Sequence, residues 1–240
     1  MWGPYRWDRI GYFIVPFTAG AMEHATNIGF MQYYLSQIPE EAESTMAHEL
    51  SHHWFGDLVT CATADEMWLN EGWASYNEYL FSEKFYGRGA YMRDVKDNHE
   101  YVLRQAHVSD GGYYAVSGVP TNLTYGRTVY DKGADVCRAV RAYMGDSLFF
   151  TAIRSYLNHY AFSTATTAQF RDYLQLFTSA NLTSLFDDWV YQPGFAHFEI
   201  DSFGYNGSAN LYNIFVRVKQ RMHHADHLYQ QVPIIITCID

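Results

Sequence analysis

Two histidines and a glutamate near position 50 have the types and spacing of a metal site. His48 and His52 are four residues apart in a stretch with helical character, so their side chains project from one helix face. Their imidazole nitrogens can then share one Zn²⁺ ion. Glu49 can reach a water on that ion as a general base, and zinc lowers the pKa of such a water toward about 7. The pattern indicates metal-assisted hydrolysis.

A catalytic zinc site needs a third protein ligand and an open fourth position, and Glu71 is the candidate. It follows His52 after 18 intervening residues and begins a second helical stretch predicted over 70–85. A helix, a connection and a second helix can return its carboxylate to the histidines. Two simpler interpretations exist: a chance HExxH match on a surface helix, and a first-turn acid favoured by the helix dipole. The three residues together favour the metal site.

Four motifs in a fixed order resemble the aminopeptidase N family of gluzincin zinc metallopeptidases. They are HELSH at 48–52, NEGWASY at 70–76, GAMEH at 20–24 and VYDKGA at 129–134. GAMEH is similar to the exopeptidase motif GAMEN of that family, with His24 in place of its Asn. VYDKGA is similar to the segment that carries the family's catalytic tyrosine. The resemblance runs from about Ile10 to about Phe195.

The resemblance implies a role for each residue of the zinc and tyrosine motifs. His48, His52 and Glu71 would bind one Zn²⁺ per chain. Glu49 would activate the water and pass its proton to the leaving amine. Tyr130 would donate a hydrogen bond to the oxyanion of the tetrahedral intermediate, where negative charge develops. Without the motif, a tyrosine on an amphipathic helix is more often a packing residue.

The GAMEH segment would bind the substrate. Glu23 would hold the free α-amine of the peptide, which makes the protein an aminopeptidase for peptides with a free N-terminus. Gly20 and Ala21 would lie along the bound peptide, where small residues allow a close approach, and Met22 belongs to the same segment. Two alternatives stay open: an endopeptidase, or a truncated, non-catalytic module of the same fold that binds zinc and peptide.

Other residues near these motifs have both a structural and a functional interpretation. Glu78, two turns after Glu71, either supports the zinc ligands or faces solvent. His53 points to another helix face than His52 and is expected to be structural. Lys132 either adds positive potential near the site or, more commonly, forms a structural ion pair.

The elements that must position these residues give an α+β pattern. Short β-rich runs at 9–15 and 28–35 flank a turn-like segment at 17–24. Helical periodicity then dominates, with helices predicted over 41–55, 70–85, 88–104, 128–144, 147–160, 167–179 and 183–190. Gly145 is predicted to end one helix, and Asp146 to be the N-cap of the next.

The pattern changes after Pro193 and Gly194, where strands are predicted over 197–203, 211–219 and 232–238. Two domains follow. Residues 1–194 would form a mainly helical, thermolysin-like catalytic domain with a few N-terminal strands. Residues 195–240 would be the start of a β-sandwich module. Only 47 residues precede His48, so the resemblance implies that part of the catalytic sheet lies outside this sequence. The remaining domains of a longer chain are then possible partners.

Composition excludes several classes of protein. The 240 residues are 48% hydrophobic and 18% aromatic, which excludes intrinsic disorder, and the longest apolar runs are far too short for a membrane span. The net charge of −10 disfavours nucleic acid as a partner.

Three widely spaced cysteines, Cys61, Cys137 and Cys238, are expected to be free buried thiols. The first residues lack the apolar region of a signal peptide, yet the resemblance favours a secreted or periplasmic location over a cytoplasmic one.

Overall fold

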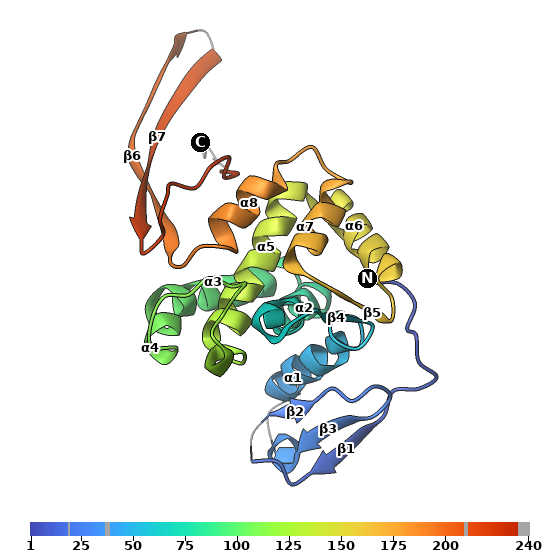
Figure 1. Cartoon of the computed structure of the whole chain (residues 1–240). Helices are drawn as coiled ribbons and strands as arrows, with labels where there is room; N and C mark the ends of the chain where they lie inside the picture. Colours follow the sequence, from blue (N-terminus) through green and yellow to red (C-terminus); the bar gives the residue numbers. More distant parts are fainter. Residues whose placement is uncertain (19, 37–38, 209–210, 235–240) are drawn as a thin grey trace.

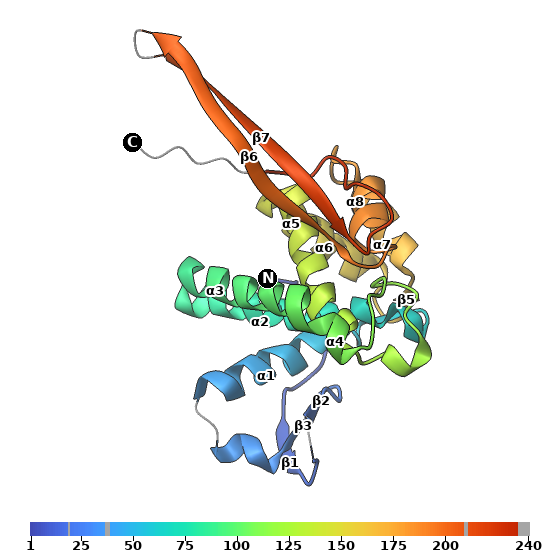
Figure 2. The same ribbon diagram turned by 90° about the vertical axis from the view of Figure 1, so that its left-hand side faces the viewer.

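The computed structural model describes residues 1–18, 20–36, 39–208 and 211–234, and combines a mainly helical body with short strands (Figure 1). This confirms the predicted mixture of helices and strands. A small sheet lies beside the first helix, and a long two-stranded ribbon extends from the other end of the molecule (Figure 2). None of the helices in these ranges is long and apolar enough to cross a membrane.

The N-terminal sheet has the strand order β1-β3-β2. β1 (Tyr12–Val15) pairs in parallel with β3 (Ile28–Met31), and β2 (Ala21–Met22) pairs antiparallel with the other side of β3. The turn-like segment predicted at 17–24 therefore contains a short edge strand. The strand predicted over 28–35 ends at Met31, and the chain continues as a 3₁₀-helix, η1 (Gln32–Ser36).

Each predicted helical stretch contains a helix. The long helices are α1 (Pro39–His52), α2 (Glu71–Tyr86), α3 (Arg88–Tyr101), α5 (Gly133–Met144), α6 (Asp146–His159), α7 (Thr167–Gln175) and α8 (Leu182–Trp189). Shorter turns lie between them: η2 (Ala64–Leu69), η3 (Val102–Ala106), α4 (His107–Ser109), η4 (Thr121–Leu123) and η5 (Thr128–Lys132). η3 and η5 are π-helical, so the stretches predicted at 88–104 and 128–144 are not uniform α-helices.

Two features between the helices differ from the sequence prediction. β4 (Val59–Cys61) and β5 (Ser163–Ala165) pair in parallel although they are about a hundred residues apart, and neither was predicted. Gly145 has a positive φ of 74° and separates α5 from α6, as expected, but it also occupies the N-cap position. Asp146 is therefore the first residue of α6, where its carboxylate accepts hydrogen bonds from Arg141.

The core is built around α2, which contacts α1, α3 and α5. Every residue from Glu71 to Asn77 is buried, because neighbours surround this half of the helix on all sides. The Trp73 indole stacks on Phe55 with ring centroids 4.5 Å apart, and Phe149 stacks on Trp73 at 5.8 Å. These aromatic contacts fix the rotation of α2 about its axis, which determines where Glu71 points.

α2 and the start of α5 approach each other at two glycines. A Cβ added at Gly72 would lie 2.9 Å from the backbone of Gly133, and a Cβ at Gly133 would lie 3.0 Å from Gly72 Cα. Neither contact can be relieved by a side-chain movement, because the atoms met are backbone atoms. Glycine at both positions therefore allows the two helices to touch.

The C-terminal part of the described chain is an antiparallel ribbon of β6 (Phe195–Ser208) and β7 (Leu211–His223). These strands confirm the first two predicted after Gly194 and are longer than predicted. Phe203, which is 81% exposed, is one of several large apolar side chains uncovered along the ribbon. Residues 232–234 are not in a strand, and 235–238 of the third predicted strand lie outside the described residues, as does Cys238. Cys61 and Cys137 are free and buried, as predicted.

The glycine contact predicts a stability effect. Gly72→Ala should lower the free energy of unfolding by about 1–3 kcal/mol, the usual cost of overpacking a filled core. Gly89→Ala is the matched control, because Gly89 lies on an exposed face of α3 and its Cβ would meet only the end of Arg93 at 3.9 Å. The control should be neutral or slightly stabilising. Equal unfolding midpoints of the two variants in urea would contradict a tight contact.

Candidate metal centre and active site

The structure brings His48, His52 and Glu71 together. Their candidate ligand atoms all lie within 4.8 Å of one another, and they form the metal-ligand cluster found in the described ranges. Glu71 Oε2 lies 3.3 Å from His48 Nε2 and 3.1 Å from His52 Nε2. The two histidines come from the last turns of α1, and Glu71 is the first residue of α2. The predicted ligand set therefore converges on one point.

Each histidine is oriented through its other ring nitrogen. His48 Nδ1 lies 2.8 Å from Glu78 Oε1, and His52 Nδ1 lies 2.9 Å from the carbonyl oxygen of Phe55. Both partners are acceptors, so each Nδ1 donates a proton, and Nε2, which faces Glu71, is the nitrogen of each ring that could bind a metal. Glu78 also accepts a hydrogen bond from Ser44. Of the two interpretations of Glu78, the structure supports the one in which it holds a ligand.

Opposing charges dominate the electrostatics of the cluster. Burial lowers the pKa of His48, but its hydrogen bonds to Glu71 and Glu78 outweigh burial and raise the pKa to about 10. Burial raises the pKa of Glu71, whereas its hydrogen bonds to the two histidines lower it to about 2. Glu71 is therefore ionised, as a metal ligand must be. Burial raises the pKa of the neighbouring Glu49 to about 7.

A cavity of about 610 Å³ opens onto the cluster, and all of the residues predicted for catalysis and substrate binding line it. Glu49 lies on α1 between the two histidines, and Glu23 follows β2. The Tyr130 ring lies parallel to the His48 ring, with centroids 6.0 Å apart. Burial and the nearby Glu71 carboxylate raise the pKa of Tyr130, so its hydroxyl stays protonated and can donate a hydrogen bond.

The cavity has further lining residues that the sequence interpretation did not identify. They are Tyr34, Thr45, Tyr125 and Arg127. Tyr125 and Arg127 precede Tyr130 by five and three residues, so their closeness to Tyr130 in the sequence was the available signal. Tyr34 and Thr45 carry no such signal, because their position beside the cavity depends on how η1 and α1 pack together.

The GAMEH segment is tied to the end of α1, which carries the two candidate histidine ligands, through His53. This histidine is fully buried, and its Nε2 donates to the backbone carbonyl of Glu23 at 3.1 Å. The Tyr5 hydroxyl lies 2.9 Å from its Nδ1. The prediction of a structural His53 is confirmed, and its role is specific: it connects the end of α1 to β2. Gly20, next to β2, has a positive φ of 71° that disfavours other residues.

The turn that carries Tyr130 is anchored on both sides. Asp110 accepts hydrogen bonds from the backbone nitrogens of Arg127 and Thr128, at 2.8 and 2.7 Å. Lys132 is buried, and its Nζ donates to the carbonyl oxygens of Tyr114 and Gln192, each at 3.2 Å. The structural ion pair predicted for Lys132 is not formed among the described residues. Burial lowers the pKa of Lys132 to about 7.

Two ring nitrogens and a carboxylate beside an open cavity are the donor set of a catalytic metal centre of the metallopeptidase type. The model of the Peptidase family M1 domain matches residues 2–189, and the chain belongs to this family. This confirms the resemblance inferred from the four motifs.

Several aminopeptidases are similar in sequence to most of this chain. Aminopeptidase M1-D of Oryza sativa subsp. japonica is 28% identical over 206 residues, which cover 80% of this chain and 23% of the relative. Probable aminopeptidase 2 of Sulfurisphaera tokodaii is 32% identical over 202 residues, covering 76% and 25%. The crystal structure of an M1 zinc metallopeptidase from Deinococcus radiodurans superimposes with a TM-score of 0.68 at 25% identity, covering 79% of this chain and 40% of that one. The chain spans about a quarter of the length of these curated relatives.

The hydrogen bond between Glu78 and His48 predicts an effect on metal affinity. Glu78→Gln removes the negative charge that accepts the Nδ1 proton of His48 and makes this imidazole a more basic ligand. Zinc affinity should therefore fall by at least about tenfold. Competition with a chromophoric chelator measures it. Glu100→Gln is the control and should leave zinc affinity unchanged, because the Glu100 side chain on α3 is 45% exposed and lies outside the metal-site cavity. Unchanged affinity in Glu78→Gln would show that this carboxylate does not support the ligand.

Proposed function

We propose that this chain is the catalytic segment of a zinc-dependent aminopeptidase that hydrolyses the N-terminal peptide bond of peptides. The observation that carries the proposal is the convergence of His48, His52 and Glu71 on the cavity that Glu49 and Tyr130 also line. One zinc ion per chain is proposed, since the described residues contain one such cluster. The names of the M1 relatives, which are aminopeptidases, support the same activity.

The donor set fits zinc. His48 and His52 would bind through Nε2, because their Nδ1 protons are held by Glu78 and the Phe55 carbonyl. Glu71 would bind through its ionised carboxylate. When bound, zinc would polarise a water molecule and make it more acidic. Two nitrogen ligands and one oxygen ligand leave a coordination position open, as hydrolysis requires.

Glu49 is proposed as the general base. It is buried beside the ligand cluster and lines the cavity. It would accept a proton from the attacking water and then deliver that proton to the nitrogen of the leaving amine. A carboxyl that both accepts and donates a proton near neutral pH works best with a pKa raised by burial.

Tyr130 is proposed as the oxyanion donor. Its ring is held parallel to His48, and Asp110 fixes the start of its turn. The phenolic proton would be donated to the carbonyl oxygen as negative charge develops there. The donor is pre-positioned by the turn, so little reorganisation is needed when the reaction occurs.

Glu23 and the edge strand β2 are proposed to hold the substrate. β2 lies at an edge of the sheet, so Gly20, Ala21 and Met22 can lie along an extended peptide. Glu23 would pair with the free α-amine, and the hydrogen bond from His53 to the Glu23 carbonyl keeps that residue in place. With the α-amine bound at Glu23, the first peptide bond of the substrate would lie at the metal, so one residue would be removed from the N-terminus, as in an aminopeptidase.

The domain assignment belongs to the same proposal. Residues 1–194 would be a thermolysin-like catalytic domain, and 195–240, with the exposed β6–β7 ribbon, the start of a β-sandwich. The remaining domains of a longer chain would be its partners, consistent with the share of the relatives that it covers. A secreted or periplasmic location remains a proposal from the family resemblance.

The role of Glu49 predicts a separation of metal binding from turnover. Glu49→Gln should keep its zinc and lose about 10²- to 10⁴-fold in kcat on an amino-acid aryl amide. Glu100→Gln serves again as the exposed control. A chelator should abolish activity in the parent protein, and added zinc should restore it. Full activity in Glu49→Gln would rule out the mechanism, and zinc binding without any turnover in the parent would favour the non-catalytic module.

The role of Tyr130 predicts an effect on kcat rather than on binding. Tyr130→Phe keeps the ring on His48 and removes only the hydroxyl, so kcat should fall by about 10²- to 10³-fold while KM changes little. Steady-state kinetics on the same aryl amide measure both constants. A change confined to KM would instead assign Tyr130 to ground-state binding.

The role of Glu23 predicts dependence on a free amine. Peptides with a free N-terminus should be cleaved and their N-acetylated counterparts should not. Glu23→Gln should lower kcat/KM for free peptides by about 10- to 100-fold, the value of a hydrogen bond to a charged group. Equal cleavage of acetylated and free peptides would identify an endopeptidase.

A further inference from the structure

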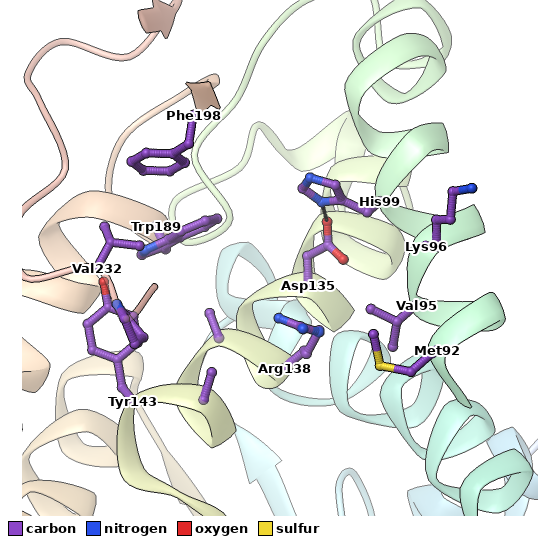
Figure 3. Close-up of a pocket in the computed structure, with 13 residues that line it drawn as sticks. Met92, Val95, Lys96, His99, Asp135, Arg138, Tyr143, Trp189, Phe198 and Val232 are labelled. Atoms are coloured by element: carbon purple, nitrogen blue, oxygen red, sulfur yellow. Dashed lines mark hydrogen bonds and ion pairs between the residues drawn. The ribbon is translucent and has the colours of Figure 1, made fainter. Parts of the chain in front are cut away.

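A second cavity, of about 340 Å³, lies between α3, α5, α8 and the base of β6. It shares no lining residue with the metal-site cavity. Met92 and Val95 from α3 form one wall, and Trp189 and Phe198 lie on the other side (Figure 3). The lining is mainly apolar, as is typical of small-molecule sites, and the volume is at the lower end of their range.

Among the described residues, the cationic side chain of Arg138 lies in this cavity without a hydrogen-bond or ion-pair partner. Arg138 projects from α5 between the α3 wall and the side that carries Tyr143 and Trp189 (Figure 3). It is only partly exposed, and its Nε is fully buried without a hydrogen-bond acceptor. Within the described ranges its guanidinium makes no hydrogen bond or ion pair. A partly buried charge without a direct hydrogen-bond or ion-pair partner is unfavourable, so an anion bound at Arg138 would stabilise this site.

The nearest acid on the same helix is already engaged. Asp135 accepts from Asn98 Nδ2 at 3.0 Å through one oxygen and from His99 Nδ1 at 2.8 Å through the other. The hydrogen bond to Asp135 raises the pKa of His99. The raised pKa favours the protonated imidazole, whose positive charge balances the negative charge of Asp135. Lys96, at the rim, has only a loose contact with Glu100 at 3.8 Å. Arg138 therefore keeps a positive charge available to a ligand.

The shape and charge together select a class of ligand. A planar guanidinium with its donors in a fork binds a carboxylate through paired hydrogen bonds. The apolar walls favour a ligand that also has an apolar body. We propose that this cavity binds a carboxylate attached to an aromatic or branched apolar group. A free organic acid and the C-terminal residue of a peptide share this chemistry.

Calorimetry with matched ligands tests the proposal on the whole 240-residue chain. The probe is 3-phenylpropionate, its uncharged counterpart is 3-phenylpropionamide, and acetate lacks the apolar body. The acid should bind at least about tenfold more tightly than either, since a hydrogen bond between charged groups adds roughly that much. A short N-acetylated peptide ending in phenylalanine, compared with its C-terminal amide, distinguishes a peptide source from a free acid. Either source supports the proposal.

Two variants and one control locate the binding. Arg138→Gln should remove the preference for the acid over the amide. Ala142→Leu narrows the cavity but keeps the Arg138 guanidinium. It should therefore weaken the binding of 3-phenylpropionate more than the binding of acetate. Arg104→Gln is the control, because Arg104 is 73% exposed and lies outside the cavity. The acid-to-amide comparison and Ala142→Leu still decide the question if Arg138→Gln does not fold.

The titrations are carried out on zinc-free and zinc-loaded protein, because zinc can itself bind a carboxylate. Binding that is equal in both forms and sensitive to Ala142→Leu supports the proposal. Equal binding of the acid and the amide, binding that persists unchanged in Arg138→Gln, or binding that requires zinc would each overturn it. None of these measurements depends on peptide hydrolysis, so they are independent of the proposed enzymatic function.

Discussion

The close approach of two helices at Gly72 and Gly133 is the constraint on which the candidate metal centre depends. Glu71 directly precedes the first glycine, and Tyr130 lies three residues before the second. When the two backbones touch, the Glu71 carboxylate and the Tyr130 phenol are brought to the same cavity. The large aromatic core around Trp73 holds α2 in the rotation that this contact requires. The contact between the two backbones and the aromatic core thus set the positions of Glu71 and Tyr130.

Charge compensation is the second organising feature of the site. Several carboxylates share a small, partly buried volume, which is unfavourable unless cations balance them. His48 lies between Glu71 and Glu78 and so interacts with two of these acids at once. The same acids make the cavity suitable for a metal ion and for the amine of a peptide. The overall acidity of the chain is therefore partly concentrated where cations would be bound.

One continuous helical stretch serves two different cavities. η5 presents Tyr130 to the metal centre, and about two turns later α5 presents Arg138 to the cavity beneath β6. The two sites differ in character: carboxylates and imidazoles dominate the lining of the first, whereas the second is mainly apolar and its polar side chains include Arg138 and the hydrogen-bonded His99–Asp135 pair. Because they share no lining residue, either can be altered without removing a side chain from the other.

Local sequence determined the chemistry of this protein. Helical spacing alone puts His48 and His52 on one face, and each predicted helix is present, because periodicity and capping act over a few residues. Tertiary structure decided the rest. The pairing of β4 with β5, the Glu78–His48 hydrogen bond and the cavity between α3, α5 and α8 all bring together segments distant in sequence. The edge strand in GAMEH forms only by pairing with β3. Such contacts depend on how whole helices pack, and short-range patterns carry no information about that packing.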